Sequence, residues 1–253
     1  MTQTSPVIIL HGWSLDSNKA QKWQEFRDAL GQNGIESEIF KIPGLSAPLD
    51  EVWSLDDYVR WLDQEISAKF PNQTIILLGH SFGGQIASRY AAVHPQKVQK
   101  LILIDSSGIR DHSLLPTLKR TSFLTAAKIG KVFFQSQAMR NLLYKLARER
   151  DYQQAPPLLR RTMSKILDDE VLADLPKISC PTLLIWGQDD RVTPLSLGKV
   201  FQQKISHSQL ELVNGARHSP QYTHPQQVAH LIQNFLIQND TGHPAVAGGK
   251  EDK

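Results

Sequence analysis

Ser81 is the residue of this sequence whose surroundings point most directly to chemistry. It stands in the stretch Gly79-His80-Ser81-Phe82-Gly83, which follows the pattern G-x-S-x-G. A serine at a tight turn between a strand and a helix lifts its hydroxyl above the sheet, and small flanking residues leave room for that strained turn. An apolar run at 75–78 precedes the motif and an apolar helical pattern at 86–92 follows it. We therefore predict that Ser81 is a nucleophile.

A serine hydroxyl is a weak nucleophile unless a base removes its proton, and histidine is the usual base. The chain has nine histidines. His218 lies in the loop after the last predicted strand, at the carboxyl end of the sheet where Ser81 is also expected. His224 is the competing candidate, but the next residue, Pro225, is predicted to begin the last helix. The placement favours His218 as the base.

Such a base is held in one tautomer by a carboxylate. The strand predicted over 182–186 is followed by two adjacent carboxylates, Asp189 and Asp190. Asp105 follows an earlier predicted strand and lies at the same edge of the sheet. Spacing alone does not choose among these three acids, although Asp190 is the favoured one.

Attack on an acyl carbonyl places negative charge on its oxygen, and preorganised backbone N–H groups stabilise that charge. One donor is expected to be the N–H of Phe82, directly after the nucleophile. The other is expected from the loop after the first strand, His11-Gly12-Trp13, through the N–H of Trp13. Together these positions predict acyl transfer to water through an acyl-enzyme.

The elements that must position these residues alternate between strand and helix, which predicts an α/β fold with a mostly parallel sheet and helices on both faces. Ser54 and Asp57 have the spacing of a capping box, which predicts the start of a helix there. Strands are predicted at 7–10, 35–42, 74–78, 101–104, 182–186 and 209–213, and helices at 19–32, from 54 through 66, at 81–94, 194–204 and 225–237.

The alternation breaks over residues 108–175, which show helical patterning and no convincing strand. We predict a hydrolase core in two parts, at 1–107 and 176–238, a helical cap at 108–175 and a disordered tail at 239–253. Open α/β sheets bind ligands beyond the carboxyl ends of their strands, so the cap is expected to roof the pocket.

The predicted cap is basic. Residues 108–177 contain 13 Lys and Arg against 7 Asp and Glu, a balance of +6. A solvated basic helix face is the simpler interpretation of this excess. The sharper hypothesis is that the cap attracts anionic substrates or a membrane surface.

Composition limits the classes of partner. A net charge of +3 is too small to predict nucleic-acid binding, and no run approaches the roughly 18 apolar residues of a membrane span. The first residues do not resemble a signal peptide, so a cytoplasmic protein is expected. The lone Cys180 is expected to be a small buried side chain, and no His/Cys cluster has zinc-ligand spacing. We therefore predict a small-molecule substrate, no cofactor and no metal.

The motifs, in their order, resemble those of the α/β-hydrolase superfamily. They are HGW at 11–13, IPGLS at 42–46, SLDDYV at 54–59, GHSFGG at 79–84, WGQDDRVTP at 186–194 and HSP at 218–220. The resemblance is closest to its capped branch of small esterases, C–C bond hydrolases, cofactor-free haloperoxidases and proline iminopeptidases.

The resemblance implies the nucleophile at Ser81, the base at His218, the oxyanion donors at Trp13 and Phe82, and the acid three residues after the strand-ending glycine, at Asp190. Only about six residues precede the first predicted strand, which suggests a sheet without the family's first two strands. Serine at position 81 argues against the epoxide hydrolase and haloalkane dehalogenase branches, which use aspartate there.

The function predicted from the sequence is therefore that of a carboxylic-ester-hydrolase-like serine hydrolase acting on a small ester or related acyl compound. Two alternatives remain open. The same fold also suits C–C bond hydrolysis or acyl transfer to an acceptor other than water. A ligand-binding receptor that retains the triad but scarcely turns over is the alternative from a different class.

Overall fold

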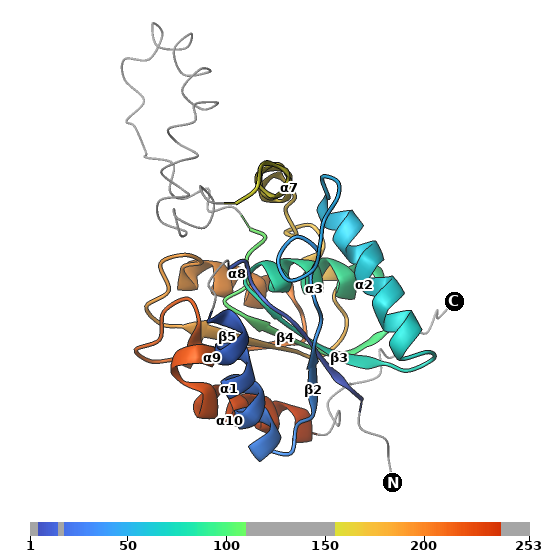
Figure 1. Cartoon of the computed structure of the whole chain (residues 1–253). Helices are drawn as coiled ribbons and strands as arrows, with labels where there is room; N and C mark the ends of the chain where they lie inside the picture. The colour runs from blue at the N-terminus through green and yellow to red at the C-terminus, as the bar shows by residue number, and fades with distance from the viewer. Residues whose placement is uncertain (1–4, 15–17, 110–154, 239–253) are drawn as a thin grey trace, which may run out of the picture.

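The computed structural model describes residues 5–14, 18–109 and 155–238 of the chain (Figure 1). Within these residues a sheet of six parallel strands has the order β2-β1-β3-β4-β5-β6. The strands are β1 (Val7–Leu10), β2 (Ser37–Ile39), β3 (Ile75–His80), β4 (Val98–Ile104), β5 (Thr182–Gly187) and β6 (Ser208–Val213). The predicted α/β fold class with a parallel sheet is confirmed.

Helices cover both faces of the sheet (Figure 1). One face is packed by α1 (Lys19–Gln32) and α10 (Pro225–Ile237), and the other by α2 (Leu55–Lys69), α3 (Phe82–Val93) and α8 (Leu195–Lys204). Successive residues of β3 point alternately into the two cores, Ile75 and Leu77 into one and Ile76 and Leu78 into the other. Because both faces are buried, parallel strands read as continuous apolar runs, which is why the sequence reveals them.

Two strand boundaries differ from the predictions for physical reasons. The strand predicted at 35–42 is only Ser37–Ile39, because its one ladder is with β1, a strand of four residues. The strand predicted at 101–104 begins earlier, at Val98. The start was missed because Lys100 interrupts the apolar pattern. The Lys100 side chain is nevertheless buried. Its ammonium donates to the carbonyls of Phe235 and Gln238 at the end of α10, at 3.1 and 3.0 Å.

The predicted capping box at the start of α2 is present. The Ser54 hydroxyl accepts the N–H of Asp57 at 3.3 Å, and the Asp57 carboxylate accepts the N–H of Ser54 at 2.7 Å. A second carboxylate, that of Asp169, accepts the N–H of Leu55 at 3.0 Å. Carboxylates are favoured at this positive end of a helix, so the segment containing Asp169 is fixed to α2.

Helix α7 (Pro157–Asp168) is the described helix of the predicted cap, and η2 (Leu175–Lys177) follows it. The Thr162 hydroxyl accepts the N–H of Trp53 at 3.3 Å, and the Gln85 amide donates to the carbonyl of Ile166 at 3.2 Å. These bonds tie α7 to the loop before α2 and to α3. Residues 110–154 and the predicted tail at 239–253 lie outside the described residues, so the cap and tail boundaries stay predictions.

Two further features agree with the composition. Cys180 is buried, as expected, where it belongs to the same core as α2 and α3. Among the described residues, every helix is too short or too polar to cross a lipid bilayer.

Candidate active site

Ser81 occupies a strained turn between β3 and α3. Its backbone has φ 52° and ψ −116°, a combination that residues other than glycine rarely adopt. The turn fits only because its neighbours lack side chains: a Cβ on Gly83 would lie 2.1 Å from the carbonyl oxygen of Leu10, and one on Gly79 would lie 2.5 Å from that of Gly83. The expected role of the two glycines is confirmed, and the serine hydroxyl stands at the carboxyl end of β3.

His218 lies in the loop between β6 and the short helix α9 (Pro220–Thr223). Its Nε2 lies 2.9 Å from Oγ of Ser81, and its Nδ1 lies 2.8 Å from Oδ2 of Asp190, which follows β5. A carboxylate accepts only, so Nδ1 carries the proton and Nε2 accepts the serine hydroxyl. His224, the competing base, instead contacts the Thr223 hydroxyl at 2.8 Å.

Asp190 is held as a carboxylate by its own loop. Its Oδ1 accepts the N–H groups of Val192 and Thr193 at 2.7 and 3.1 Å, and its Oδ2 accepts the Thr193 hydroxyl at 2.7 Å. Burial opposes ionisation, but the hydrogen bond and charge of His218, with these loop donors, lower the pKa of Asp190 overall. The ionised form that would orient an imidazole is the favoured one.

The other two candidate acids are placed differently. Asp189 is exposed, and its backbone N–H donates to the carbonyl of Ala216 at 2.9 Å. Asp105 is fully buried at the end of β4, and its Oδ1 accepts the N–H of Gly187 at 2.9 Å. The structure thus brings Asp190, rather than either of these, into a hydrogen bond with His218.

Two residues that the sequence analysis did not single out also hold the site. The Thr193 hydroxyl donates to Asp190 as described, and the Asp-x-x-Thr spacing at 190–193 is a local pattern that could have revealed it. His80 is buried, and its Nε2 donates to the backbone carbonyl of His218 at 2.8 Å. That bond joins residues 138 positions apart, so no local pattern could have revealed it.

The loop after β1 lies directly against the nucleophile. A Cβ on Gly12 would lie 3.0 Å from Cβ of Ser81, and the Trp13 ring meets the Phe82 ring edge-on at 6.1 Å between centroids. Among the residues that the structure describes, the backbone N–H groups of Trp13 and Phe82 donate to no acceptor. The oxyanion role of these two N–H groups stays a prediction.

His11 fixes the shape of this loop. Its Nδ1 donates to the carbonyl of Gly12 at 2.9 Å, so its Nε2 accepts the Ser46 hydroxyl at 2.8 Å. Burial, helped by the positive charge of Lys19, lowers the pKa of His11 to about 4. The ring is therefore neutral at neutral pH, in the one tautomer that serves both bonds.

One trio of described side chains has atoms close enough to share a metal ion. Ring nitrogens of His80 and His218 and a carboxylate oxygen of Asp105 lie within 4.8 Å of one another. However, both nitrogens of His218 are engaged by Ser81 and Asp190, and Nε2 of His80 is engaged by a carbonyl. The donor set is organised for hydrogen bonding within the protein.

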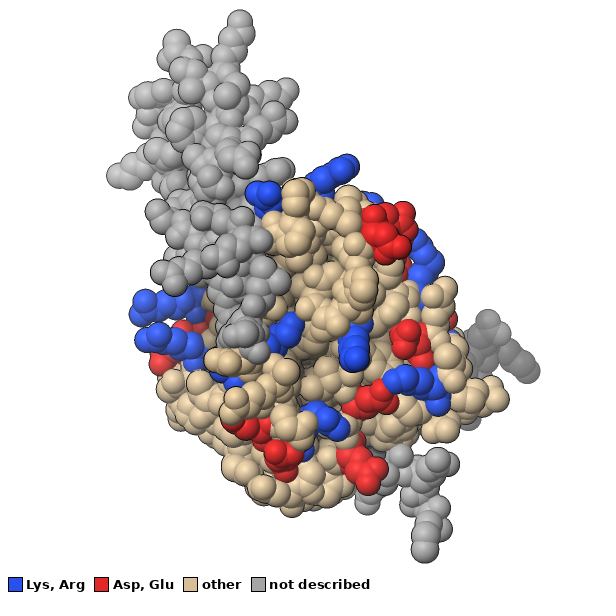
Figure 2. All heavy atoms as spheres, viewed as in Figure 1, with Lys and Arg blue, Asp and Glu red and all other residues tan. Residues whose placement is uncertain are grey.

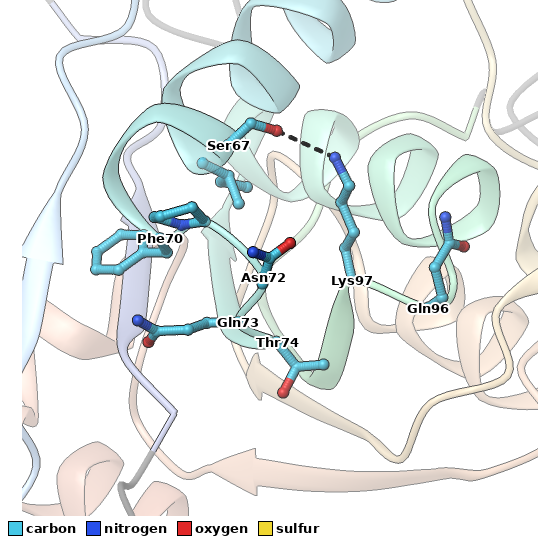
Figure 3. Close-up of a pocket in the computed structure, with 9 residues that line it drawn as sticks. Ser67, Phe70, Asn72, Gln73, Thr74, Gln96 and Lys97 are labelled. Atoms are coloured by element: carbon cyan, nitrogen blue, oxygen red, sulfur yellow. Dashed lines mark hydrogen bonds between the residues drawn. The ribbon is translucent and has the colours of Figure 1, made fainter.

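A pocket of about 370 Å³ lies at the opposite end of β3 (Figure 3). It is lined by the last turn of α2, the turn that follows, and Gln96 and Lys97 before β4. The Lys97 ammonium crosses it to reach the Ser67 hydroxyl at 3.2 Å. Because Thr74 in its wall precedes β3 while Ser81 follows it, this pocket belongs to the other edge of the sheet.

The sequence pattern that describes the Alpha/beta hydrolase family matches residues 7–231. The chain belongs to this family. The match spans every strand of the described sheet and the stretch that carries Ser81, Asp190 and His218. Family membership confirms the resemblance seen in the sequence motifs.

Relatives within the α/β-hydrolase family match nearly the whole chain. A pimeloyl-[acyl-carrier protein] methyl ester esterase of Aeromonas hydrophila is 27% identical to this chain. The alignment covers 92% of this chain and 96% of the esterase. A 2-hydroxymuconate semialdehyde hydrolase of Pseudomonas putida is 24% identical, with 94% and 89% of the two chains covered.

Solved structures show the same α/β-hydrolase fold. The hydrolase MGS-MChE2, from a metagenome of lagoon sediments of Mar Chica, superposes with a TM-score of 0.64 at 23% identity, covering 91% of this chain and 90% of its own. A serine hydrolase involved in carbazole degradation gives a TM-score of 0.65 at 22% identity, covering 92% and 91%.

Proposed function

We propose that this protein is a serine hydrolase that cleaves a small ester or a related acyl compound through an acyl-enzyme. The observation that carries the proposal is the pair of hydrogen bonds at His218, 2.9 Å to the Ser81 hydroxyl and 2.8 Å to the Asp190 carboxylate. A hydroxyl, an imidazole and a carboxylate in this sequence activate a serine for attack.

In the first half of the proposed reaction, Oγ of Ser81 forms a bond to the substrate carbonyl carbon while its proton moves to Nε2 of His218. Asp190 stabilises the resulting imidazolium, and the N–H groups of Trp13 and Phe82 bind the oxyanion. The carbon–oxygen bond to the leaving alcohol then breaks. The leaving group takes the proton from His218 and departs, leaving an acyl-enzyme.

In the second half, a water molecule gives one proton to Nε2 of His218 and attacks the acyl carbon. The same N–H groups hold the new oxyanion. Its collapse breaks the bond to Ser81, whose oxygen recovers the proton from His218, and the carboxylic acid is released. The side chains end as they began, so the cycle needs no group beyond the protein and water.

An ester is the favoured substrate class because the Aeromonas relative, the more similar of the two described above, is named as a methyl ester esterase. C–C bond hydrolysis is the second candidate. The Pseudomonas relative, named as a semialdehyde hydrolase, favours it. Both reactions would use the same serine, base and oxyanion donors, so the substrate must discriminate between them.

Sustained turnover on a substrate panel tests the proposal. The panel holds short aryl esters of increasing acyl length, a thioester and a vinylogous diketone, each assayed with wild type and the Ser81→Ala variant. Many turnovers per wild-type enzyme on the esters, and none by the variant, are expected. Preference for the diketone would favour the second candidate. Failure to turn over any of these compounds would contradict the proposal and leave the receptor alternative.

We further propose that an anionic acyl group is preferred, because residues 108–177 carry an excess of six positive charges, which could attract an anionic substrate. This excess comes from the residues before 155, since the described part at 155–177 has four Lys and Arg and four Asp and Glu. Arg161 and Lys165 of α7 are exposed, and Arg160 is partly so. Over the face drawn in Figure 2, Lys and Arg elsewhere are interspersed with Asp and Glu. Esters of matched length with neutral and carboxylate-bearing acyl groups test this preference at low and high salt. Equal kcat/KM for the two would contradict it.

A further inference from the structure

His80 is a buried polar side chain directly before the nucleophile, and the proposed reaction gives it no step. It is the last residue of β3, and its backbone is paired with that of Ile104 in β4. Because the side chains of a strand alternate, its ring lies on the sheet face that Ile76 and Leu78 share with α1 and α10. The ring therefore stands on a rigid base at the edge of the sheet that carries the site.

Aromatic side chains from other elements hold the His80 ring in place. Trp23 of α1 meets it edge-on, with 6.2 Å between the ring centroids. Tyr222 of α9 packs against it at 6.2 Å, and the ring of His218 lies 5.2 Å away at 46°. Close packing of this kind leaves a side chain few alternative rotamers. The position of the His80 ring relative to the sheet is therefore fixed.

Two edges of the His80 ring face two different loops of the site. On one edge, Nε2 donates to the backbone carbonyl of His218 at 2.8 Å. On the other edge, a Cβ added to Gly12 would lie 2.7 Å from Nδ1 and 3.1 Å from Cε1, so the loop after β1 lies against the ring. The ring thus stands between the loop of the proposed base and the loop of the proposed oxyanion donor.

We propose that His80 is a positioning residue that holds the backbone of His218 at the place from which its imidazole reaches Ser81. The proposal rests on the proposed function, since the place of His218 matters only if it is the base. The His80 ring takes part in no proton transfer. It ties the loop after β6 to β3 and keeps that loop at a fixed separation from Gly12.

The bond to the backbone complements the bonds to the His218 ring. Asp190 fixes the ring through Nδ1, and Ser81 meets it at Nε2. The Cα from which the ring extends is set by the backbone, and His80 anchors that backbone through its carbonyl. Misplacing a catalytic group by about 1 Å can cost about 10²-fold in rate. Loss of the anchor is therefore expected to slow the chemical step more than it weakens substrate binding.

Nitrogen-15 NMR of the histidine rings in the wild-type protein tests the bond without substrate. A carbonyl only accepts, so Nε2 of His80 must carry a proton. We expect that proton to exchange slowly with solvent because the side chain is buried. The exposed ring of His230 on α10 is the control and should exchange fast. A His80 ring protonated at Nδ1 alone would overturn the proposal and leave the proposed function standing.

Glutamine and methionine at position 80 provide a matched pair, because they have similar length and volume and only glutamine offers an N–H donor. At equal concentrations of folded protein, His80→Gln is expected to keep kcat within about threefold of wild type. His80→Met is expected to lower kcat about tenfold and to leave KM within about twofold. Equal kcat values for the two variants would show that the donor has no part in positioning the base.

The ring proton of His218 separates positioning from a general loss of stability. Its Nδ1–H, bonded to Asp190 at 2.8 Å, is expected to give a far-downfield proton resonance in wild type and in His80→Gln. In His80→Met this resonance should broaden or vanish. If it stays as sharp as in wild type while kcat falls, the proposal is wrong. Should His80→Met not fold, His80→Asn replaces it, because its amide ends where Nδ1 of the ring lies, short of the carbonyl.

Discussion

Asp190 receives four hydrogen bonds: from the N–H groups of Val192 and Thr193, the Thr193 hydroxyl and the His218 ring. These bonds fix the orientation of the Asp190 carboxylate. Because the His218 ring is hydrogen-bonded to that carboxylate, the orientation of the ring is fixed as well. A carboxylate so placed accepts the Nδ1 proton of His218 and leaves Nε2 ready to accept from Ser81. The chemistry at this scale depends on which ring nitrogen carries the proton.

Replacing Asp190 by asparagine tests that dependence. The amide preserves the volume but can donate to Nδ1, which favours the wrong tautomer, so kcat for ester hydrolysis is expected to fall by about 10⁴-fold. The exposed neighbour provides the control, and Asp189→Asn is expected to stay within about twofold of wild type. Equal losses in the two variants, or activity retained in Asp190→Asn, would refute the role of Asp190.

Residue type and order predicted more of the site than local spacing could. Ser81 and His218 follow from a motif and from a place at the end of a strand, and the structure puts them in contact. The choice among three acids needed the resemblance, because Asp105, Asp189 and Asp190 all follow strands at one edge. The hydrogen bond from His80 to the His218 loop could not be predicted from the sequence. Its acceptor is a backbone carbonyl, which any residue at position 218 would supply.

At the scale of elements, α2 shows how a helix start anchors the carboxyl edge of the sheet. Its capping box lies beside the bond from the N–H of Leu55 to Asp169, which joins α2 to the segment after α7. Ser54→Ala removes the side-chain acceptor for the N–H of Asp57 and should lower the free energy of unfolding by about 1 kcal/mol. Urea denaturation measures this change.

The matched control for Ser54→Ala is Ser196→Ala. Ser196 is exposed in the first turn of α8, whose N-cap is Pro194, and so does not cap a helix. Its replacement is expected to change the free energy of unfolding by no more than about 0.5 kcal/mol. If the two variants are equally stable, the capping box does not contribute as described.

Helices with clear apolar spacing were predicted well, and strands with polar interruptions less so. Helices α1 and α10 begin and end where the sequence placed them, at 19–32 and 225–237. The start of β4 was missed because Lys100 interrupts the apolar run of this strand. The Lys100 side chain is buried, however, and the Lys100 ammonium reaches the end of α10. Whether a lysine is buried depends on distant carbonyls, which a local pattern does not report.

At the scale of the whole molecule, one parallel sheet lies between two hydrophobic cores. This framework holds the loops that carry Ser81, Asp190 and His218 next to one another. The alternation of elements predicted the fold class. The strand order was not predicted, because it depends on long-range pairing such as that of β1 with β3. The loop after β1 is part of this framework, and a buried histidine in it makes stability depend on pH.

His11 should make the whole protein less stable in mild acid. Its pKa is about 4 in the folded protein, whereas in the unfolded chain it is near 6.5. Between these values the unfolded chain binds the extra proton, so the stabilisation present above pH 6.5 is lost as the pH falls towards 4. The loss between pH 7 and pH 5 should be about 2 kcal/mol.

Urea denaturation of wild type and His11→Asn at both pH values measures this contribution, and the variant should lose about 2 kcal/mol less than wild type on acidification. If the variant does not fold, a titration of the histidine ring protons by NMR in wild type provides the same information. A His11 that titrates near 6.5 in the native protein would disprove the account of this loop.

The central claim is that Ser81 carries the reaction, and the kcat of an aryl ester hydrolysed by wild type and by Ser81→Ala tests it most directly. Both proteins should give the same circular dichroism spectrum and the same midpoint of thermal unfolding, since the substitution removes only one hydroxyl from a partly buried side chain. The account predicts sustained wild-type turnover and a loss of at least about 10⁴-fold in the variant. Comparable turnover by the two proteins would contradict it.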